Sequence, residues 1–163
     1  MLIKFIAPCA ILAAALAGCE SAQKHEESPP PQEVTPGSTF TVTKDFLIPS
    51  GNTSVYFQDT QLYPLGEIQG NNPYCKFIMG AATAAGKVIK GTMTVSNVDY
   101  DERGIDPSGA SVSITTIHLR QASSGEPYRM DCMLPLLSPD ALFVTPAEIQ
   151  GALGGYMDLK VLP

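Results

Sequence analysis

The chain has 163 residues, with 16 acidic and 10 basic side chains and a formal net charge of −6 at pH 7. Binding to nucleic acid depends on Lys and Arg side chains that neutralise phosphates, so this charge balance argues against a nucleic-acid partner. It also argues against electrostatic attachment to anionic lipid headgroups.

The first 18 residues have the pattern of a signal peptide. One charged residue, Lys4, precedes an uncharged and mostly apolar run from Phe5 to Gly18. This run is shorter than the ~20 residues that a helix needs to cross the hydrocarbon layer of a bilayer. A short basic start, an apolar middle and small residues at the end are typical of a cleaved secretory signal. We therefore expect residues 1–18 to be removed.

The residues at the end of the leader, Leu16-Ala17-Gly18-Cys19, resemble the lipobox of bacterial lipoproteins. In that family the Cys sulfur receives a diacylglyceryl group, the leader is cleaved before the Cys, and the new amine is acylated. The resemblance implies that Cys19 begins the mature chain and carries a lipid anchor, since several acyl chains make desorption negligible. Glu20, rather than the Asp that favours inner-membrane retention in this family, implies the periplasmic face of the outer membrane in a Gram-negative host. The alternative is an ordinary secretory signal followed by a chance Cys.

Residues 19–37 are rich in proline and glutamate and contain almost no large apolar side chains. Such a segment buries too little surface to offset the entropy of ordering, so we expect a disordered tether. It would hold the rest of the chain, residues 38–163, clear of the membrane as a single domain.

From residue 38 onward, short segments alternate apolar and polar side chains and are separated by Gly, Pro, Asn and Asp. Examples are residues 54–58, 75–79, 128–134 and 156–161. Period-two alternation is typical of half-buried strands. The pattern predicts a mainly β fold, an antiparallel β-sandwich or barrel of about seven or eight strands.

Two segments within this region need separate treatment. In the segment 111–120, Val112 and Ile114 share one parity while Ile117 and Leu119 share the other. Either both faces of this strand are covered or a β-bulge near residues 115–116 resets the register, and the second option is favoured. Separately, Thr145-Pro146-Ala147-Glu148 is a capping box that predicts one short helix near 146–153.

Cys75 and Cys132 are the cysteines that remain after Cys9 leaves with the leader and Cys19 is lipidated. An even pair outside the cytosol favours a disulfide over a metal site, for which His or Cys partners at metal-ligand spacing are missing. Both residues share the parity of the apolar positions around them, so the sulfurs should point into the core. The bridge would join neighbouring strands or facing sheets and have a structural role.

The sequence contains only weak indications of a catalytic or metal-binding site. His118 is the only imidazole after the tether, and we expect it to face solvent or a sheet rim. The acidic segment 99–106, with Asp99, Asp101 and Asp106, resembles a degenerate calcium loop, but Arg103 occupies a ligand position and Ala110 replaces the final Glu. A solvated hairpin loop is the favoured interpretation.

Tyr56, Tyr74 and Tyr156 each have the parity opposite to the expected core face, whereas Tyr63 and Tyr100 are expected in loops. Tyr is enriched at protein interfaces, so the first three are candidates for a binding surface. The alternative is that they stack across strands on the outer face of the sheet.

Together these features favour a lipid-anchored cell-envelope protein that acts as a non-enzymatic binding module without a cofactor. Its partner would be another envelope or secreted protein, or a glycan. Two alternatives belong to other classes: an envelope hydrolase or isomerase that uses His118, and a carrier of a small apolar ligand inside the barrel.

Overall fold

The computed structural model describes residues 33–49, 51–64, 67–79, 88–106, 109–136 and 143–162. The signal, Cys19 and the tether up to residue 32 lie outside the described residues. The elements are β1 (Thr39–Leu47), β2 (Ser54–Gln58), β3 (Gln61–Tyr63), β4 (Tyr74–Met79), β5 (Val88–Ile105), β6 (Ser111–Gln121), β7 (Pro127–Pro135), α1 (Pro146–Leu153), the 3-10 helix η1 (Gly154–Tyr156) and β8 (Met157–Lys160).

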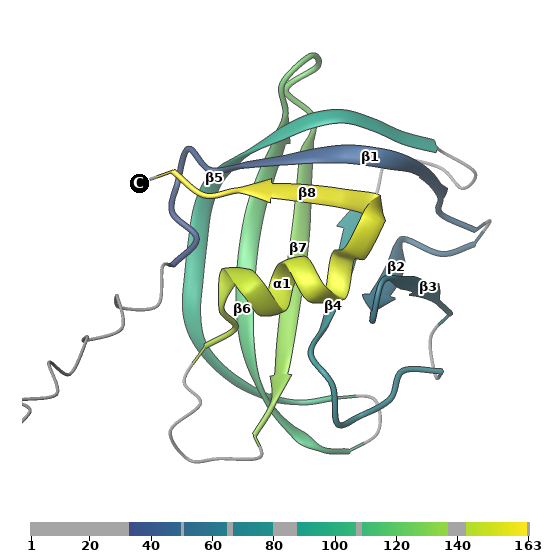
Figure 1. Cartoon of the computed structure of the whole chain (residues 1–163), viewed down its shortest axis with the longest axis vertical. Helices are drawn as coiled ribbons and strands as arrows, with labels where there is room; N and C mark the ends of the chain where they lie inside the picture. Colours follow the sequence, from purple (N-terminus) through teal and green to yellow (C-terminus); the bar gives the residue numbers. More distant parts are fainter. Residues whose placement is uncertain are drawn as a thin grey trace, which may run out of the picture.

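The eight strands of the described residues form one curled antiparallel sheet in the order β3-β2-β4-β7-β6-β5-β1-β8 (Figure 1). The mainly β, antiparallel fold with one short helix is therefore confirmed. The single sheet is a half-barrel, so the core lies inside one curved sheet instead of between two facing sheets. Helix α1 lies across the concave side of the curl (Figure 1).

The main hydrophobic core fills this concave side. Side chains of alternate strand positions point inward, among them Phe40, Phe57, Phe77 and Met130, all of them fully buried. Helix α1 contributes Ile149, Ala152 and Leu153 to the same core. The period-two pattern of the sequence correctly identifies these inward positions because it depends only on the local pleat of each strand.

Helix α1 begins where the sequence predicts. Thr145 is its N-cap; its hydroxyl accepts a hydrogen bond from the Glu148 amide (3.3 Å), and the Glu148 carboxylate accepts one from the Thr145 amide (2.7 Å). Pro146 occupies the first helical position, where its missing N–H costs nothing. Gly154, at φ +53°, ends the helix.

Helix α1 and η1 also link the two ends of the sheet. On one side, the Thr60 amide of the β2–β3 turn donates to the Ala152 carbonyl (3.3 Å). On the other, the Gln150 side chain accepts from the Leu159 amide (2.8 Å) and donates to the Met157 carbonyl (2.9 Å). The curled sheet is therefore closed by a helix, and the Gln150 amide covers backbone groups of β8 that an edge strand would otherwise expose.

The prediction of a β-bulge in the segment 111–120 is wrong. β6 pairs with β7 in one continuous register from Val112↔Pro135 to Arg120↔Pro127, and the register shifts lie in the partner strand β5. Both faces of β6 are covered instead. Ile117 and Leu119 face the main core, while Val112 belongs to a second cluster on the convex side.

Two boundaries differ from the sequence expectation. The acidic segment, expected as a hairpin loop, lies mostly within β5, which continues to Ile105. At the start of the domain, Val34 lies within the predicted tether but is buried in the main core, and its carbonyl accepts a hydrogen bond from the Tyr100 hydroxyl. Packing therefore begins four residues before Ser38.

Candidate functional site

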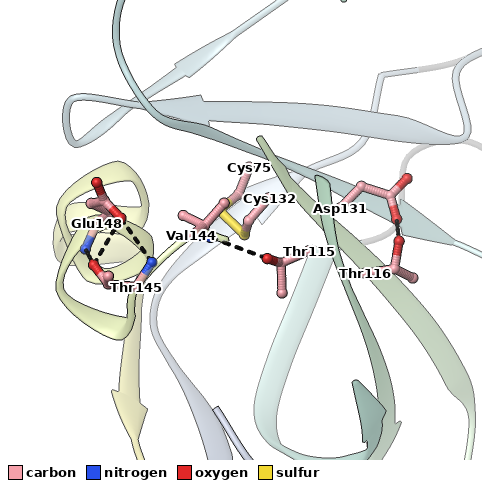
Figure 2. The surroundings of a disulfide bond; sticks show 8 residues. All are labelled: Cys75, Thr115, Thr116, Asp131, Cys132, Val144, Thr145 and Glu148. Carbon is pink, nitrogen blue, oxygen red and sulfur yellow. Dashed lines mark hydrogen bonds between the residues drawn. A yellow bond between two sulfur atoms is a disulfide. The ribbon is translucent and has the colours of Figure 1, made fainter. Parts of the chain in front are cut away.

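The disulfide joins Cys75 of β4 to Cys132 of β7, as the sequence predicts (Figure 2). The two residues are directly opposite each other in the antiparallel register, with their Cα atoms 4.0 Å apart, and both side chains are fully buried. Of the two arrangements that the sequence left open, the bridge between neighbouring strands is the observed one. Its burial in the main core supports a structural role.

A buried hydrogen bond next to the disulfide positions the chain that leads into α1. Thr115 of β6 is paired with Cys132, and its hydroxyl accepts a hydrogen bond from the Val144 amide (3.2 Å; Figure 2). Thr115 and Val144 are both buried. The start of the helix is thus fixed to the centre of the sheet.

The three candidate tyrosines do not form one exposed surface. Tyr56 and Tyr74 do lie on the convex side, with ring centroids 6.4 Å apart, but they are buried in a second hydrophobic cluster. Tyr156 instead packs against Phe46 and Phe57 at the main core. The expectation that all three face outward together is wrong. The face of β2 and β4 that points away from the main core is covered by a loop, and Tyr156 lies in η1, where strand parity does not apply.

The loop 67–73 provides this cover, and Gln58 holds it in place. The fully buried Gln58 side chain accepts from the Gln69 amide (2.8 Å) and donates to the carbonyls of Gln69 (2.7 Å) and Asn72 (3.1 Å). Ile68 of this loop packs onto the second cluster. The loop is therefore part of the folded structure and shields Tyr74.

A hollow of about 260 Å³ lies beside this cluster, at the β2–β3 end of the sheet. Its apolar lining comes from Leu47 at the end of β1, Val55 of β2 and Leu62 of β3, together with two prolines. Leu47 is half exposed, at 51%. Small-molecule sites are typically apolar hollows with a few polar groups, so this hollow is a candidate site.

Four polar side chains complete the lining of this hollow: Asn52, Ser54, Tyr56 and Tyr63. Within the described residues, no hydrogen bond joins their side-chain polar atoms to another residue. The lining residues that the structure describes include no charged side chain. The hollow can therefore accept and donate several hydrogen bonds but offers no counter-charge to an ion.

Sequence reasoning identified only Tyr56 among these residues. Asn52 lies in one of the Gly-, Pro- and Asn-containing separators between the expected strands, and Tyr63 was expected in a loop although it lies in β3. The turn itself is present, since the Asn52 amide donates to the Pro49 carbonyl (3.1 Å). No local pattern indicates that this turn meets the β2–β3 hairpin, because their proximity is a property of the folded sheet.

A second hollow, of about 310 Å³, adjoins Tyr56 on the convex side. It is lined by Lys76 and Asp106 and by apolar residues that include Ile105, which is 77% exposed. The Lys76 ammonium lies 5.7 Å from the centroid of the Tyr56 ring. Tyr56 therefore forms a wall common to both hollows.

Tyr74 carries a buried hydroxyl with no hydrogen-bond partner among the described residues. Burial, with smaller contributions from nearby Asp106 and Tyr56, raises the pKa of Tyr74 well above its ordinary range. An unpartnered buried hydroxyl is destabilising. This group marks the second cluster as less than fully optimised for stability.

His118 forms a pair with Asp99 on the convex face, with 2.9 Å between Nε2 and the Asp99 carboxylate. Both side chains are about half exposed, so the expectation of a solvent-facing histidine is confirmed. Arg129, opposite His118 in the register, contacts Asp131 (3.0 Å), and Thr116 donates to the same Asp131 carboxylate. No serine or threonine hydroxyl of the described residues is hydrogen-bonded to the imidazole, as a nucleophile–base pair would require.

The described side chains of the acidic segment do not form a metal site. Among the residues that the structure describes, no group of three or more His, Cys, Asp or Glu side chains is arranged to hold a metal ion. Asp106 instead accepts a hydrogen bond from the Ala110 amide (2.9 Å) in the β5–β6 turn. The side chain of Asp101 lies outside the described residues.

The comparisons with known proteins do not assign the chain to a class. No protein-family model matches it, and no curated protein or solved structure is significantly similar to it. Over the described part of the chain, no helix has the length and apolar character that crossing a membrane requires. The site residues must therefore be interpreted from their own geometry.

Proposed function

We propose that this chain is a lipid-anchored cell-envelope protein whose folded domain is a non-enzymatic binding module. The anchor is the lipid on Cys19, and the tether separates the domain from the membrane. In a Gram-negative host the domain would face the periplasm from the outer membrane. Part of this proposal rests on the lipobox resemblance, and the other part rests on the hollow at the β2–β3 end of the sheet.

The observation that supports a binding role is the uncharged hollow at the β2–β3 end of the sheet. It combines an apolar lining with the unengaged polar groups of Asn52, Ser54 and Tyr63. Helix α1 and large side chains fill the concave side, which argues against a carrier with its ligand inside the curl. Binding at the edge of a rigid, disulfide-linked sheet needs no catalytic group.

The test is affinity capture from detergent-solubilised envelope with the full chain as bait. Asn52→Ala removes an exposed amide from the hollow, and Gln61→Ala removes an exposed amide from β3 outside the hollow. We expect a captured component that Asn52→Ala loses and Gln61→Ala retains. Failure of the unmodified chain to capture any component, or equal capture by both variants, would contradict a binding role for this hollow.

A hydrolase or isomerase is the second candidate, because His118 and Asp99 lie in contact. This pair could polarise a hydroxyl or a water molecule that a bound substrate places against the imidazole. The test is hydrolysis of cell-wall and lipid-ester substrates by the full chain and by His118→Ala. Turnover that disappears in His118→Ala, without a captured partner, would reverse the order of the two candidates.

A further inference from the structure

We infer that the hollow at the β2–β3 end of the sheet binds a neutral, hydroxyl-rich sugar ring of an envelope glycan. This inference rests on the proposed binding function and names the ligand class for the same site. It follows from three properties of the hollow: its lack of charge, its aromatic wall and its unengaged hydrogen-bonding groups.

The charge of the lining excludes ionic ligands from this hollow. No described lining residue carries a charged side chain. A bound ion would lose hydration without gaining a partner of opposite charge, which is unfavourable. The nearby Lys76 and Asp106 line the second hollow, on the other side of Tyr56. The occupant of the first hollow is therefore expected to be neutral.

The polar groups exclude a purely apolar ligand. The hydroxyls of Ser54, Tyr56 and Tyr63 and the amide of Asn52 have no partner among the described residues. A hydrocarbon placed here would displace water from these groups without replacing their hydrogen bonds. A ligand with several hydroxyls can both donate to and accept from them, since a Tyr or Ser hydroxyl and an Asn amide each do both.

The aromatic wall formed by Tyr63 fits the two-sided character of a pyranose ring. One face of such a ring presents C–H groups, which pack on the flat surface of a Tyr side chain, while its edge presents hydroxyls. Tyr63 is only partly buried and offers one such ring to the hollow, whereas its β2 partner Tyr56 is 5% exposed and can contribute little beyond its hydroxyl. The lining by Leu62 and Val55 extends the apolar contact.

A peptide is less well suited to this place. Strand addition to the sheet edge needs a continuous row of backbone donors and acceptors. β3 has only three residues and is followed by Pro64, which has no N–H to donate. Recognition here would have to rely on side chains, which is the usual way that a compact ring is held.

The test uses the full chain in a sugar-free polyoxyethylene detergent, because an alkyl glycoside would itself present a sugar to the site. The chain contains no tryptophan, so Tyr63→Trp places a single fluorescent reporter in the hollow. The probes are chitotriose and maltotriose as neutral sugars, tri-galacturonate as a charged sugar, and octaproline as a peptide. Saturation-transfer NMR on the unmodified chain provides a second readout without the substitution.

We expect saturable binding of at least one neutral trisaccharide and none of tri-galacturonate or octaproline. Asn52→Ala should weaken this binding about three- to tenfold, as the loss of one hydrogen bond implies, and Gln61→Ala should leave it unchanged. Tyr63→Phe keeps the ring and should weaken binding less than Tyr63→Ala. If Tyr63→Ala fails to fold, the exposed Asn52→Ala variant still decides the question.

Three results would overturn the inference: no neutral trisaccharide binding at concentrations up to about 10 mM, roughly ten times a millimolar Kd; binding that Asn52→Ala does not weaken; or preferential binding of octaproline. Affinity capture that depends on Asn52 in the absence of sugar binding would leave the proposed binding function standing and remove only the glycan. If neither Asn52-dependent capture nor sugar binding is observed, the proposed binding function is overturned as well.

Discussion

Replacing Gly154 by alanine should disrupt the contact between helix α1 and the β2–β3 turn that closes the curled sheet. A Cβ atom at this residue would lie 2.2 Å from Cβ and 2.4 Å from Cα of Thr60, in the β2–β3 turn. Thr60 cannot easily retreat, because its amide is hydrogen-bonded to the Ala152 carbonyl. The contact therefore joins the end of α1 to the hairpin at the far end of the sheet.

The cost of Gly154→Ala has two parts. The backbone of Gly154 has φ +53° and ψ −137°, a sparsely populated conformation that costs a residue with a side chain roughly 1–3 kcal/mol. Forcing an extra methyl into an occupied space typically costs roughly 1–3 kcal/mol. We expect the free energy of unfolding to fall by about 2–6 kcal/mol, the sum of these ranges.

Two neighbouring glycines provide matched controls. A Cβ at Gly151 or Gly155 would meet no atom within 4 Å. Gly151 is inside α1, so Gly151→Ala should stabilise the chain by about 0.5–1 kcal/mol. Gly155→Ala should change the free energy of unfolding by less than about 0.5 kcal/mol.

The assay is urea unfolding of the disulfide-bonded chain, followed by far-UV circular dichroism. A second substitution, Thr60→Gly, should rescue Gly154→Ala only in part, because it removes the Thr60 side chain and leaves its Cα in the way. If Gly154→Ala unfolds at the same urea concentration as Gly155→Ala, the helix does not close the sheet in the manner described.

Three further predictions concern the disulfide and the second cluster. Replacing both Cys75 and Cys132 by Ala should lower the free energy of unfolding by about 4 kcal/mol, since the bridge spans 57 residues of sequence, and a loss below about 1 kcal/mol in urea unfolding would be inconsistent with that role. Tyr74→Phe removes a buried unpartnered hydroxyl and should stabilise the chain by about 1 kcal/mol at pH 7, whereas a destabilised variant would indicate a missed partner. Burial raises the folded-state pKa of Tyr74, so above about pH 10 the phenol ionises in the unfolded chain before it does in the folded one, and the free energy of unfolding falls as the pH rises. Unfolding measured as a function of pH should show that Tyr74→Phe reduces this alkaline loss of stability. Gln58→Ala should cost at least about 2 kcal/mol, because three hydrogen bonds to the loop 67–73 are lost, and hydrogen exchange should increase in that loop but not in β6.

The parts of the fold that depend on local pattern were predictable from sequence. Strand parity placed Cys75 and Cys132 inward, and the capping box located α1, because pleat and helix capping are set by residues close in sequence. The sequence did not separate a pair of facing sheets from one curled sheet, since inward alternation is the same in both. That distinction depends on how far the sheet bends and on what closes it, here helix α1.

Predictions that depend on what covers a strand face were less successful. Tyr56 and Tyr74 have the convex parity, yet the loop pinned by Gln58 buries them. Val112 likewise has a parity opposite to the main core and is buried without the expected bulge. A second cluster requires contacts between distant segments, and alternation within one strand contains no information about them.

The candidate hollow was hidden for the same reason. Asn52, Ser54 and Tyr63 come from a turn and two strands that meet only in the folded sheet. Individually they read as turn or surface residues. Only their common hollow, its lack of charge and their unengaged polar atoms make them a candidate site.

The central claim is that a folded β domain is held at a membrane by lipid on Cys19. Intact-mass spectrometry of the full chain, expressed in a bacterium and extracted from its membranes with detergent, tests this most directly. The account predicts a chain that begins at Cys19 with a diacylglyceryl group and an acylated amine, and a Cys19→Ser variant without the lipid. A mature protein that retains Met1, or one with an unmodified thiol at Cys19, would contradict it.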